Sequence, residues 1–381
     1  MRILHTADWH LGKKLVRADR LAEQQSELTA LENIVERENV DIVVIAGDIF
    51  DTFVPTAEAE ILFYDKVVAI SRHCPIVVIA GNHDDEDRLC APDRIARSNG
   101  IIFTDGLNTN GLALTHSSGA KIYGENGCIK VEKAGEKLNL AVFPFPTTAK
   151  LLDLAKEKNY SEFVGERLNE LAQNFVKGEI NALATHLFVL GANTSDEREL
   201  GGSKIVPKTV FDLPYCNFVM LGHIHKPMTV SKTQNIYYSG SLLRYSFDDT
   251  TDKRVLIFDS DGENTTVNPV AITGGKRLIT VEVDSKDDAV MALNEHIDDY
   301  VKILYRSAVP LTAKDMSEIR KIPSFVEISV IAEREQSERE SNKGKSATEL
   351  FEIFYQTMRE GKKPSAELID IYLKALNGEL N

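Results

Sequence analysis

Seven side chains that could bind metal ions stand just after short apolar stretches of this chain. They are two aspartates, one asparagine and four histidines: Asp8, His10, Asp48, Asn82, His186, His223 and His225. Short apolar runs bounded by glycine and polar residues predict buried strands. Open α/β sheets place their chemistry just beyond the carboxyl ends of their strands, so the seven side chains converge if these strands share a sheet. Carboxylate, amide oxygen and imidazole suit Mn²⁺, Fe²⁺ or Zn²⁺, and the set indicates a two-metal phosphoesterase site.

Five apolar runs position these residues, and each run predicts a strand. They cover residues 2–6, 40–47, 75–81, 182–185 and 218–222. Each motif alone also fits an ordinary loop, because glycine and aspartate are common turn residues. The stretch Gly222-His223-Ile224-His225 is more specific, since alternation along an extended chain points both imidazoles the same way. The complete ordered set is what indicates a metal site.

The motifs around these residues resemble those of the calcineurin-like metallophosphoesterases, and among them the SbcD-type nuclease subunits of bacteria. The residues that carry the resemblance are Thr6-Ala7-Asp8-Trp9-His10-Leu11-Gly12, Ala46-Gly47-Asp48-Ile49-Phe50-Asp51, Ala80-Gly81-Asn82-His83-Asp84, Gly222-His223-Ile224-His225-Lys226-Pro227 and Tyr238-Ser239-Gly240-Ser241. The first and fourth of these motifs are more specific than the generic motifs of the superfamily. The resemblance covers roughly residues 1–260 and resumes weakly near the C-terminus.

This resemblance implies an α/β fold: a two-sheet α/β/β/α sandwich with a small α/β cap domain and a C-terminal helical tail. It implies a Mn²⁺-dependent DNA nuclease, a 3'-5' exonuclease on double strands and an endonuclease on single strands and hairpins, in DNA end processing, repair, recombination and replication. The implied partner is an SbcC-type coiled-coil ABC ATPase in a heterotetramer, with a homodimer formed through the nuclease domain. The implied location is the bacterial cytoplasm, with activity at the nucleoid.

The resemblance also implies a role for each site residue. Asp48 is expected to bridge two metal ions. Each ion has three further ligands: Asp8, His10 and His225 on one side, and Asn82, His186 and His223 on the other. His83 is expected to donate the proton to the leaving group, with Asp84 orienting its ring. The alternatives for His83 are an eighth ligand or a structural histidine.

Two further residues near the motifs, Asp51 and His5, are not expected to bind metal. Archaeal and eukaryotic relatives have a histidine three residues after the bridging aspartate, but here Asp51 stands there. A phosphate contact made by that histidine therefore does not carry over. His5 lies inside the first predicted strand, and we expect it to support a ligand from behind or to belong to the core.

Periodicity and composition divide the chain into four parts. They are residues 1–272, an α/β unit (273–332), a charged linker (333–345) and a helical tail (346–381). The resemblance implies that residues 1–272 are the nuclease domain, that residues 273–332 are a cap domain that helps to hold DNA, and that the tail binds the ATPase. Apolar spacing predicts helices at residues 22–38 and 57–70 in the first part. In the second it predicts strands at 278–283 and 325–331, with a helix at 287–305 between them.

The tail is predicted to form two helices with apolar faces. Ser346 and Glu349 have the spacing of a capping box, and Ser365 can cap the second helix. The residues expected to bind the partner are Leu350, Phe351, Phe354, Leu368, Tyr372 and Leu376. Docking of both helices on their own protein is the alternative, but their place beyond a polar linker favours a groove on a partner.

The composition is that of a globular enzyme with an acidic surface. Lysine and arginine number 44 against 58 acidic residues, a net charge of −14, whereas nucleic-acid binders are usually basic. Binding of DNA phosphates therefore requires a local basic patch, for which the candidates follow the motifs: Lys13, Lys14, Arg17, Arg20, Arg88, Arg94 and Lys226. The four cysteines have no Cys-x-x-Cys spacing, which does not support a zinc ribbon and favours reduced core residues. We expect no secretion signal and no membrane-spanning segment.

Two other functional classes remain open from the sequence. The first is a phosphatase of the same superfamily that acts on small molecules or proteins, because fold and metal ligands do not fix the substrate. The second is a non-catalytic subunit that binds DNA ends. The motif flanks and the tail argue against the phosphatase, and the intact ligand set argues against the non-catalytic subunit.

Overall fold

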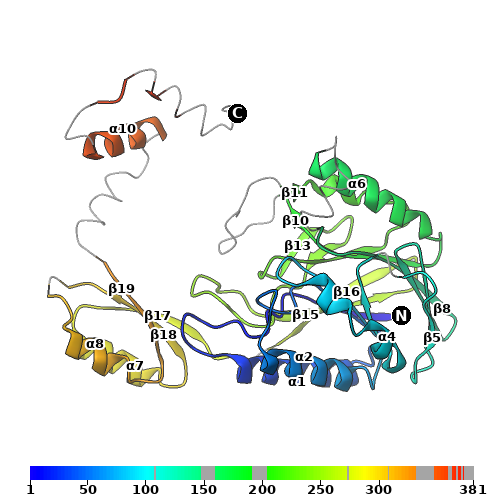
Figure 1. Cartoon of the computed structure of the whole chain (residues 1–381), viewed down its shortest axis with the longest axis horizontal. Coiled ribbons are helices and arrows are strands. Elements are labelled where there is room, and N and C mark those ends of the chain that lie inside the picture. Colours follow the sequence, from blue (N-terminus) through cyan, green and yellow to red (C-terminus); the bar gives the residue numbers. More distant parts are fainter. Residues whose placement is uncertain are drawn as a thin grey trace. The chain divides into compact units, whose positions relative to one another are not determined.

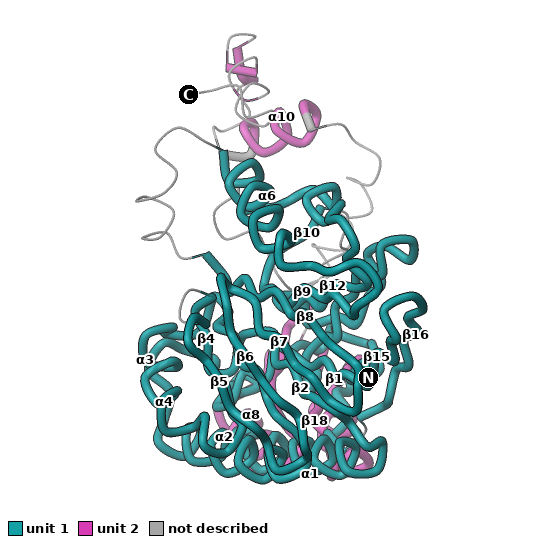
Figure 2. Tube along the Cα trace, turned by 90° about the vertical axis from the view of Figure 1, so that its right-hand side faces the viewer, with its two compact units in different colours: residues 1–279 teal, residues 280–381 magenta. Residues whose placement is uncertain are grey.

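The protein is described by a computed structural model, whose described residues are 1–106, 109–146, 159–190, 204–272, 274–307, 309–331, 347–358, 363–365, 368–369 and 372. The chain forms two compact units, Met1–Ile279 and Thr280–Asn381 (Figure 2).

Two large sheets make up the first unit. The six-stranded sheet has the order β16-β15-β1-β2-β3-β4, with β1 to β4 parallel. Its strands are β1 (Arg2–Thr6), β2 (Ile42–Ala46), β3 (Ile76–Ile79), β4 (Ile101–Thr104), β15 (Arg254–Ser260) and β16 (Thr265–Ala271). The expected strands at residues 2–6, 40–47 and 75–81 are therefore confirmed. They lie side by side in the sheet.

The eight-stranded sheet has the order β13-β14-β12-β9-β8-β7-β6-β5. Its strands are β5 (Ala113–Thr115), β6 (Lys121–Glu125), β7 (Cys128–Lys133), β8 (Glu136–Phe143), β9 (Ile180–His186), β12 (Phe218–Gly222), β13 (Met228–Ser231) and β14 (Ile236–Tyr238). The short strands β10 (Phe188–Val189) and β11 (Ile205–Val206) pair separately. The expected strands at 182–185 and 218–222 are confirmed as β9 and β12, but they belong to this second sheet. The site residues therefore come from two sheets.

Helices cover the outer face of each sheet (Figure 1). They are α1 (Leu21–Arg37), α2 (Ala57–Ile70), α3 (Glu86–Cys90), α4 (Asp93–Ala96) and α6 (Tyr160–Leu171). Successive side chains of a strand point to opposite faces, so each central strand serves two cores. In β2, Val43 packs with α1 and α2 while Val44 packs against the other sheet. In β12, Met220 faces the first sheet while Leu221 packs with α6. Three apolar layers between four structural layers confirm the expected α/β/β/α sandwich.

The second unit contains a three-stranded sheet with the order β17-β18-β19. Its elements are β17 (Leu278–Val283), α7 (Lys286–Glu295), β18 (Tyr300–Tyr305), α8 (Ala313–Ile319) and β19 (Phe325–Val330). The strands expected at 278–283 and 325–331 are confirmed.

The helix expected at residues 287–305 is wrong in its second half. Helix α7 ends at Glu295, and residues 300–305 form strand β18. The pattern there has a period of two, because Val301 and Ile303 are fully buried while Lys302 and Leu304 are half-buried. Aromatic and β-branched residues favour a strand over a helix in such a stretch.

The first tail helix forms as expected. Helix α10 spans Ala347–Met358 and exposes Leu350 and Phe354, while Phe351 stacks on Tyr372 with ring centroids 4.1 Å apart. The main-chain amide of Leu368 donates to Ser365 Oγ at 3.2 Å, as a cap of the second helix requires. The linker 333–345, Ser346 and Leu376 lie outside the described residues. In the described part of the chain, no helix combines the length and apolarity needed to span a membrane.

Candidate metal centre

The strands that carry the site end in backbone conformations that few residues adopt. Asp8, His10, Asp48 and His223 have φ angles of 54°, 44°, 51° and 104°. Positive φ is uncommon outside glycine, and it costs on the order of 1–3 kcal/mol per residue when the surrounding structure must enforce it. The turns after β1, β2 and β12 are held open this way, and they bring these four side chains into one space.

Glycines next to these residues allow the two sheets to approach closely. A β-carbon on Gly222 would collide with Ala46 O and lie 2.6 Å from His186 Nδ1. One on Gly81 would lie 2.8 Å from Asp48 Cγ. Such contacts are closer than real β-carbons tolerate. The glycines of the motifs are therefore required by the packing around Asp48 and His186.

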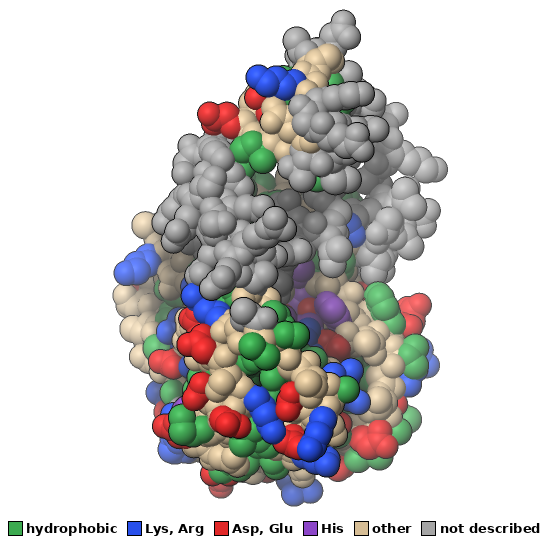
Figure 3. Space-filling view, turned by 90° about the vertical axis from the view of Figure 1, so that its left-hand side faces the viewer, with side chains coloured by type: hydrophobic (Ala, Val, Ile, Leu, Met, Phe, Trp, Pro, Cys, Tyr) green, Lys and Arg blue, Asp and Glu red, His purple; other side chains and the backbone are tan. Residues whose placement is uncertain are grey.

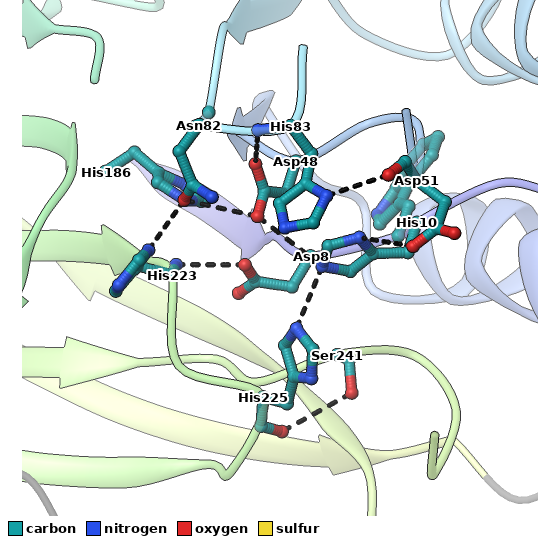
Figure 4. Close-up of polar contacts among 12 residues, drawn as sticks. Asp8, His10, Asp48, Asp51, Asn82, His83, His186, His223, His225 and Ser241 are labelled. Atoms are coloured by element: carbon teal, nitrogen blue, oxygen red, sulfur yellow. Dashed lines mark hydrogen bonds and ion pairs between the residues drawn. The ribbon is translucent and has the colours of Figure 1, made fainter. Parts of the chain in front are cut away.

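The seven predicted ligands lie together, with Asp48 between two groups of three (Figure 4). In the first group, His225 Nε2 lies 2.8 Å from His10 Nε2, and one nitrogen or oxygen of Asp8, His10 and His225 lies within 4.8 Å of the others. Asp8 Oδ1 accepts the main-chain amide of His223 at 2.9 Å. This bond holds the start of the Gly-His-x-His loop against β1.

The second group surrounds the side-chain oxygen of Asn82. His223 Nδ1 lies 2.7 Å and His186 Nε2 lies 3.1 Å from Asn82 Oδ1. His186 Nδ1 donates to Ala46 O at 2.8 Å, so Nε2 is the ring nitrogen that faces the site. A hydrogen bond to the far nitrogen is the usual way in which a metal-binding histidine is oriented.

Asp48 lies between the two groups. Its Oδ2 atom is 3.4 Å from both His10 Nε2 and His186 Nε2, and its Oδ1 atom accepts the main-chain amide of His83 at 2.9 Å. A carboxylate can bridge two cations because it has two oxygens and a negative charge. The donor set is thus three oxygen-bearing and four imidazole side chains facing one another, which fits two divalent cations.

Burial and neighbouring charges shift the pKa values of several site residues. Burial alone would lower the pKa of His186, but the neighbouring Asp48 carboxylate raises it to about 9. Burial raises the pKa of Asp8 to about 7, despite the opposing effect of His186. Burial, reinforced by His186, lowers the pKa of His223 to about 3, so this ring is neutral and able to act as a ligand at neutral pH.

The side chains of the site differ in their exposure to solvent. Asp8, His10, Asp48 and His186 are buried, whereas Asn82, His83, His223 and His225 are partly exposed. Histidine side chains with acidic neighbours are visible in a hollow of the surface (Figure 3).

The contact expected between Asp84 and His83 is wrong. The Asp84 carboxylate accepts the main-chain amides of Ile49, Phe50 and Gly81 at 3.1, 3.0 and 2.8 Å. His83 Nδ1 instead donates to Asp51 O at 2.8 Å. A buried carboxylate directed at three amide donors satisfies them, so Asp84 fixes the loop after β2 and supports the position of His83 only indirectly.

The carboxylate of Asp51 lies between a proposed metal ligand and a lysine, a position that the sequence alone did not predict. Its Oδ1 atom lies 3.6 Å from His10 Nδ1 and 3.1 Å from Lys13 Nζ. Burial would raise the pKa of Asp51, but the nearby His10 imidazole and the Lys13 ammonium outweigh it and lower the pKa to about 2. Of the basic candidates, Lys13 therefore lies at the site but is paired.

Two further residues hold the first loop and were missed in the sequence. Gln24 Nε2 donates to His10 O at 2.8 Å, and Gln24 Oε1 accepts the amide of Gly12 at 3.0 Å. Tyr245 OH donates to Trp9 O at 2.6 Å. A signal for Gln24 exists, since helical spacing places this polar residue on the same buried face as Leu28. Nothing in the sequence points to Tyr245.

His5 lies where a core residue was expected. Its side chain is fully buried in β1, and its ring centroid lies 6.3 Å from that of Phe258. Burial lowers its pKa to about 3, and the main-chain carbonyl of Leu221 offsets only part of this effect. The ring is therefore neutral inside the sandwich.

Comparison with known proteins agrees with this architecture. The profile of the calcineurin-like phosphoesterase family matches residues 1–227. The SbcD component of nuclease SbcCD from Bacillus subtilis (strain 168) is 33% identical over 99% of this chain and 98% of its own length. The same component from Staphylococcus epidermidis (strain ATCC 12228 / FDA PCI 1200) is 31% identical over 67% of this chain and 64% of its own length. The chain therefore belongs to the calcineurin-like phosphoesterase family and, within it, to the SbcD nuclease subunits.

Proposed function

We propose that this protein is a metal-dependent DNA nuclease that hydrolyses phosphodiester bonds at the centre around Asp48. The observation that carries the proposal is the gathering of six other oxygen and nitrogen ligands, from two sheets, around the buried carboxylate of Asp48. The similarity to the Bacillus subtilis nuclease component over nearly the whole chain supports DNA as the substrate.

The proposed ligands are the seven residues brought together at the strand ends. Asp48 would contact both ions, one of which Asp8, His10 and His225 would also hold, and the other Asn82, His186 and His223. Mn²⁺ is the proposed ion, since a mixed oxygen and nitrogen set does not form the all-oxygen octahedral cage that Mg²⁺ prefers.

Hydrolysis at this centre would need both the metal ions and a proton donor, for which His83 is the candidate. Two divalent ions in such a centre lower the pKa of a bound water and neutralise charge on the phosphate. His83 is partly exposed at the mouth of the site, and its main-chain amide is tied to Asp48 Oδ1. With Nδ1 held by Asp51 O, its Nε2 atom is the one that can donate a proton to the leaving oxygen.

Membership of the SbcD nuclease subunits supports a more detailed proposal for the kinds of DNA that are cleaved and for the partner protein. We propose 3'-5' exonuclease activity on duplex ends and endonuclease activity on single strands and hairpins, in DNA repair and recombination. Residues 273–332 would act as the DNA cap. The tail helices, with Leu350 and Phe354 exposed, would bind an SbcC-type ATPase in a heterotetramer whose nuclease domains form a homodimer.

The experiment that tests this function compares substrates. Linear duplex, hairpin and single-stranded DNA are incubated with the purified chain and Mn²⁺, with and without the ATPase partner, beside p-nitrophenyl phosphate. We expect cleavage of DNA that stops in excess chelator and in Asp48→Asn. Hydrolysis of p-nitrophenyl phosphate without DNA cleavage in any mixture would indicate a phosphatase. Metal-independent DNA binding without turnover would indicate a non-catalytic protein that binds DNA ends.

A further inference from the structure

We infer that Lys253 is a positioning residue that, together with Ser241, fixes the main chain at His225 and so directs its imidazole toward His10. The inference rests on the proposed metal centre and deepens it. It also gives a purpose to the Tyr238-Ser239-Gly240-Ser241 motif, which contributes no ligand.

Three groups converge on one carbonyl oxygen. His225 O accepts Lys253 Nζ at 2.8 Å and the main-chain amide of Ser241 at 3.0 Å. The Ser241 hydroxyl lies 3.4 Å from the same oxygen (Figure 4) and 3.1 Å from Lys253 Nζ. Because Ser241 Oγ donates to Leu243 O at 2.7 Å, it can accept a hydrogen bond from the ammonium group. The carbonyl is thus held from two separate segments of the chain.

Glycine is required next to this contact. A β-carbon on Gly240 would lie 2.7 Å from both His225 O and Pro227 N, and Gly240 has a φ of 78°. The motif therefore allows its main chain to lie directly against the loop that carries His225. This is the same use of glycine as at Gly222, on the other side of the loop.

The charge that holds the loop is itself buried and paired. The Lys253 side chain is 5% exposed, and its Nζ lies 2.5 Å from Asp249 Oδ2. Asp249 Oδ1 in turn accepts the amide and hydroxyl of Thr251 at 3.0 and 2.6 Å. Burying an ammonium group costs free energy unless the group is paired, so packing alone does not explain a lysine at this position. Its third contact, beyond Asp249 and Ser241, is the carbonyl of a proposed ligand.

Accurate placement of this loop matters because two imidazoles meet there. His225 Nε2 and His10 Nε2 are 2.8 Å apart, close enough for both to share one cation. Rotation of the His225 peptide would move one ring away from the other. Loss of such a supporting contact typically lowers metal affinity by about 10–100-fold. We therefore expect Lys253 to act on the ion held by Asp8, His10 and His225 and not on the other ion.

The test is titration of the full chain with Mn²⁺ by isothermal calorimetry, comparing wild type with Lys253→Met. We expect two sites in the wild type, and in Lys253→Met a loss of about 10-fold or more in affinity at one site only. Lys133→Met is the matched control, because Lys133 also forms a part-buried ion pair, with Asp41 at 2.6 Å, near the opposite ends of the strands. It should leave both affinities unchanged.

A second pair of variants covers the case in which Lys253→Met does not fold. Lys253→Arg keeps a donor and should retain more affinity than Lys253→Met, while Asp249→Asn should weaken the same single site. Unchanged Mn²⁺ binding in the folded Lys253 variants, or equal weakening of both sites, would overturn the inference. A wild type that binds fewer than two ions would overturn it together with the metal centre. Two ions with a selective Lys253 effect but no DNA cleavage would contradict only the proposed function.

Discussion

His83 is held by the main chain, which makes its predicted role separable from metal binding. Its Nδ1 atom is bonded to Asp51 O, and its side chain supplies none of the seven proposed ligands. His83→Leu should therefore keep both ions and DNA affinity while reducing cleavage by about 10²–10⁴-fold, the usual contribution of general acid catalysis. Metal titration and single-turnover cleavage of one oligonucleotide check this.

The opposite outcome has a structural basis. His10, Asp48 and His83 can present ligand atoms within 4.8 Å of one another. Loss of an ion from His83→Leu would therefore make His83 an eighth ligand. Asp84→Asn is the comparison variant. It should weaken activity through the loop after β2, because its carboxylate contacts Ile49 and Phe50 instead of the ring.

His5 should make stability depend on pH. An ordinary histidine has a pKa of about 6.5, and burial lowers that of His5 to about 3. Between pH 3 and pH 6.5, His5 is therefore protonated in the unfolded chain and neutral in the folded chain. Stability is fully present above pH 6.5 and is lost as pH falls from 6.5 toward 3, by about 2 kcal/mol at pH 5 for a shift of this size. Urea unfolding of chelator-treated His5→Leu at pH 8 and pH 5 should show a correspondingly smaller loss than wild type. An equal loss in both proteins would show that His5 is not protonated on unfolding in this range.

At the scale of the elements, close approach of the two sheets depends on Gly222. Gly222→Ala would push against Ala46 O and His186 Nδ1 at the end of β12. We expect a loss of about 1–3 kcal/mol in unfolding free energy, the usual cost of overpacking, with weakened metal binding. Gly165→Ala in α6 is the control, since among the residues that the structure describes its β-carbon would meet nothing nearer than Val210 Cγ1 at 3.7 Å. Gly165→Ala should be neutral or stabilising, because alanine favours a helix. Equal behaviour of the two variants would refute the packing argument.

The strands that position the site were predictable, because each is a short, nearly continuous apolar run that ends at a polar side chain. Strand β18 was not, since its alternation between Val301 and Lys302 follows a helix after only four residues. Contacts within the site depend on how strained turns direct their side chains, which no periodicity encodes. The sequence therefore pointed to His83 and Asp84 but not to their separate partners. It also contained no signal for the hydrogen bond from Lys253 to the main-chain carbonyl of His225.

At the scale of the whole molecule, the tail should be separable from the catalytic centre. All seven proposed ligands lie in the unit Met1–Ile279, whereas α10 lies in the other. Deleting residues 346–381 should abolish co-purification with the ATPase and ATP-dependent duplex cleavage. Metal binding and basal cleavage of single strands should remain. Phe354→Ala should weaken the complex by about 2 kcal/mol or more if this exposed ring is a hot spot.

Arg88→Ala is a control for the tail variants, since it changes an exposed charge in the other unit. It should leave the complex with the ATPase intact. An unchanged complex after deletion would move the interface elsewhere on the molecule. Loss of metal binding after deletion would show that the tail helices support the fold of the nuclease unit.

The central claim is that Asp48 bridges two metal ions, and anomalous diffraction from Mn²⁺-soaked crystals tests it most directly. The account predicts two anomalous peaks roughly 3.5–4 Å apart, one beside Asp8, His10 and His225 and the other beside Asn82, His186 and His223, with Asp48 contacting both. Asp48→Asn crystals should lose at least one peak, and that protein should not cleave DNA. A single peak in the wild type, or two peaks that persist with full nuclease activity in Asp48→Asn, would contradict the account.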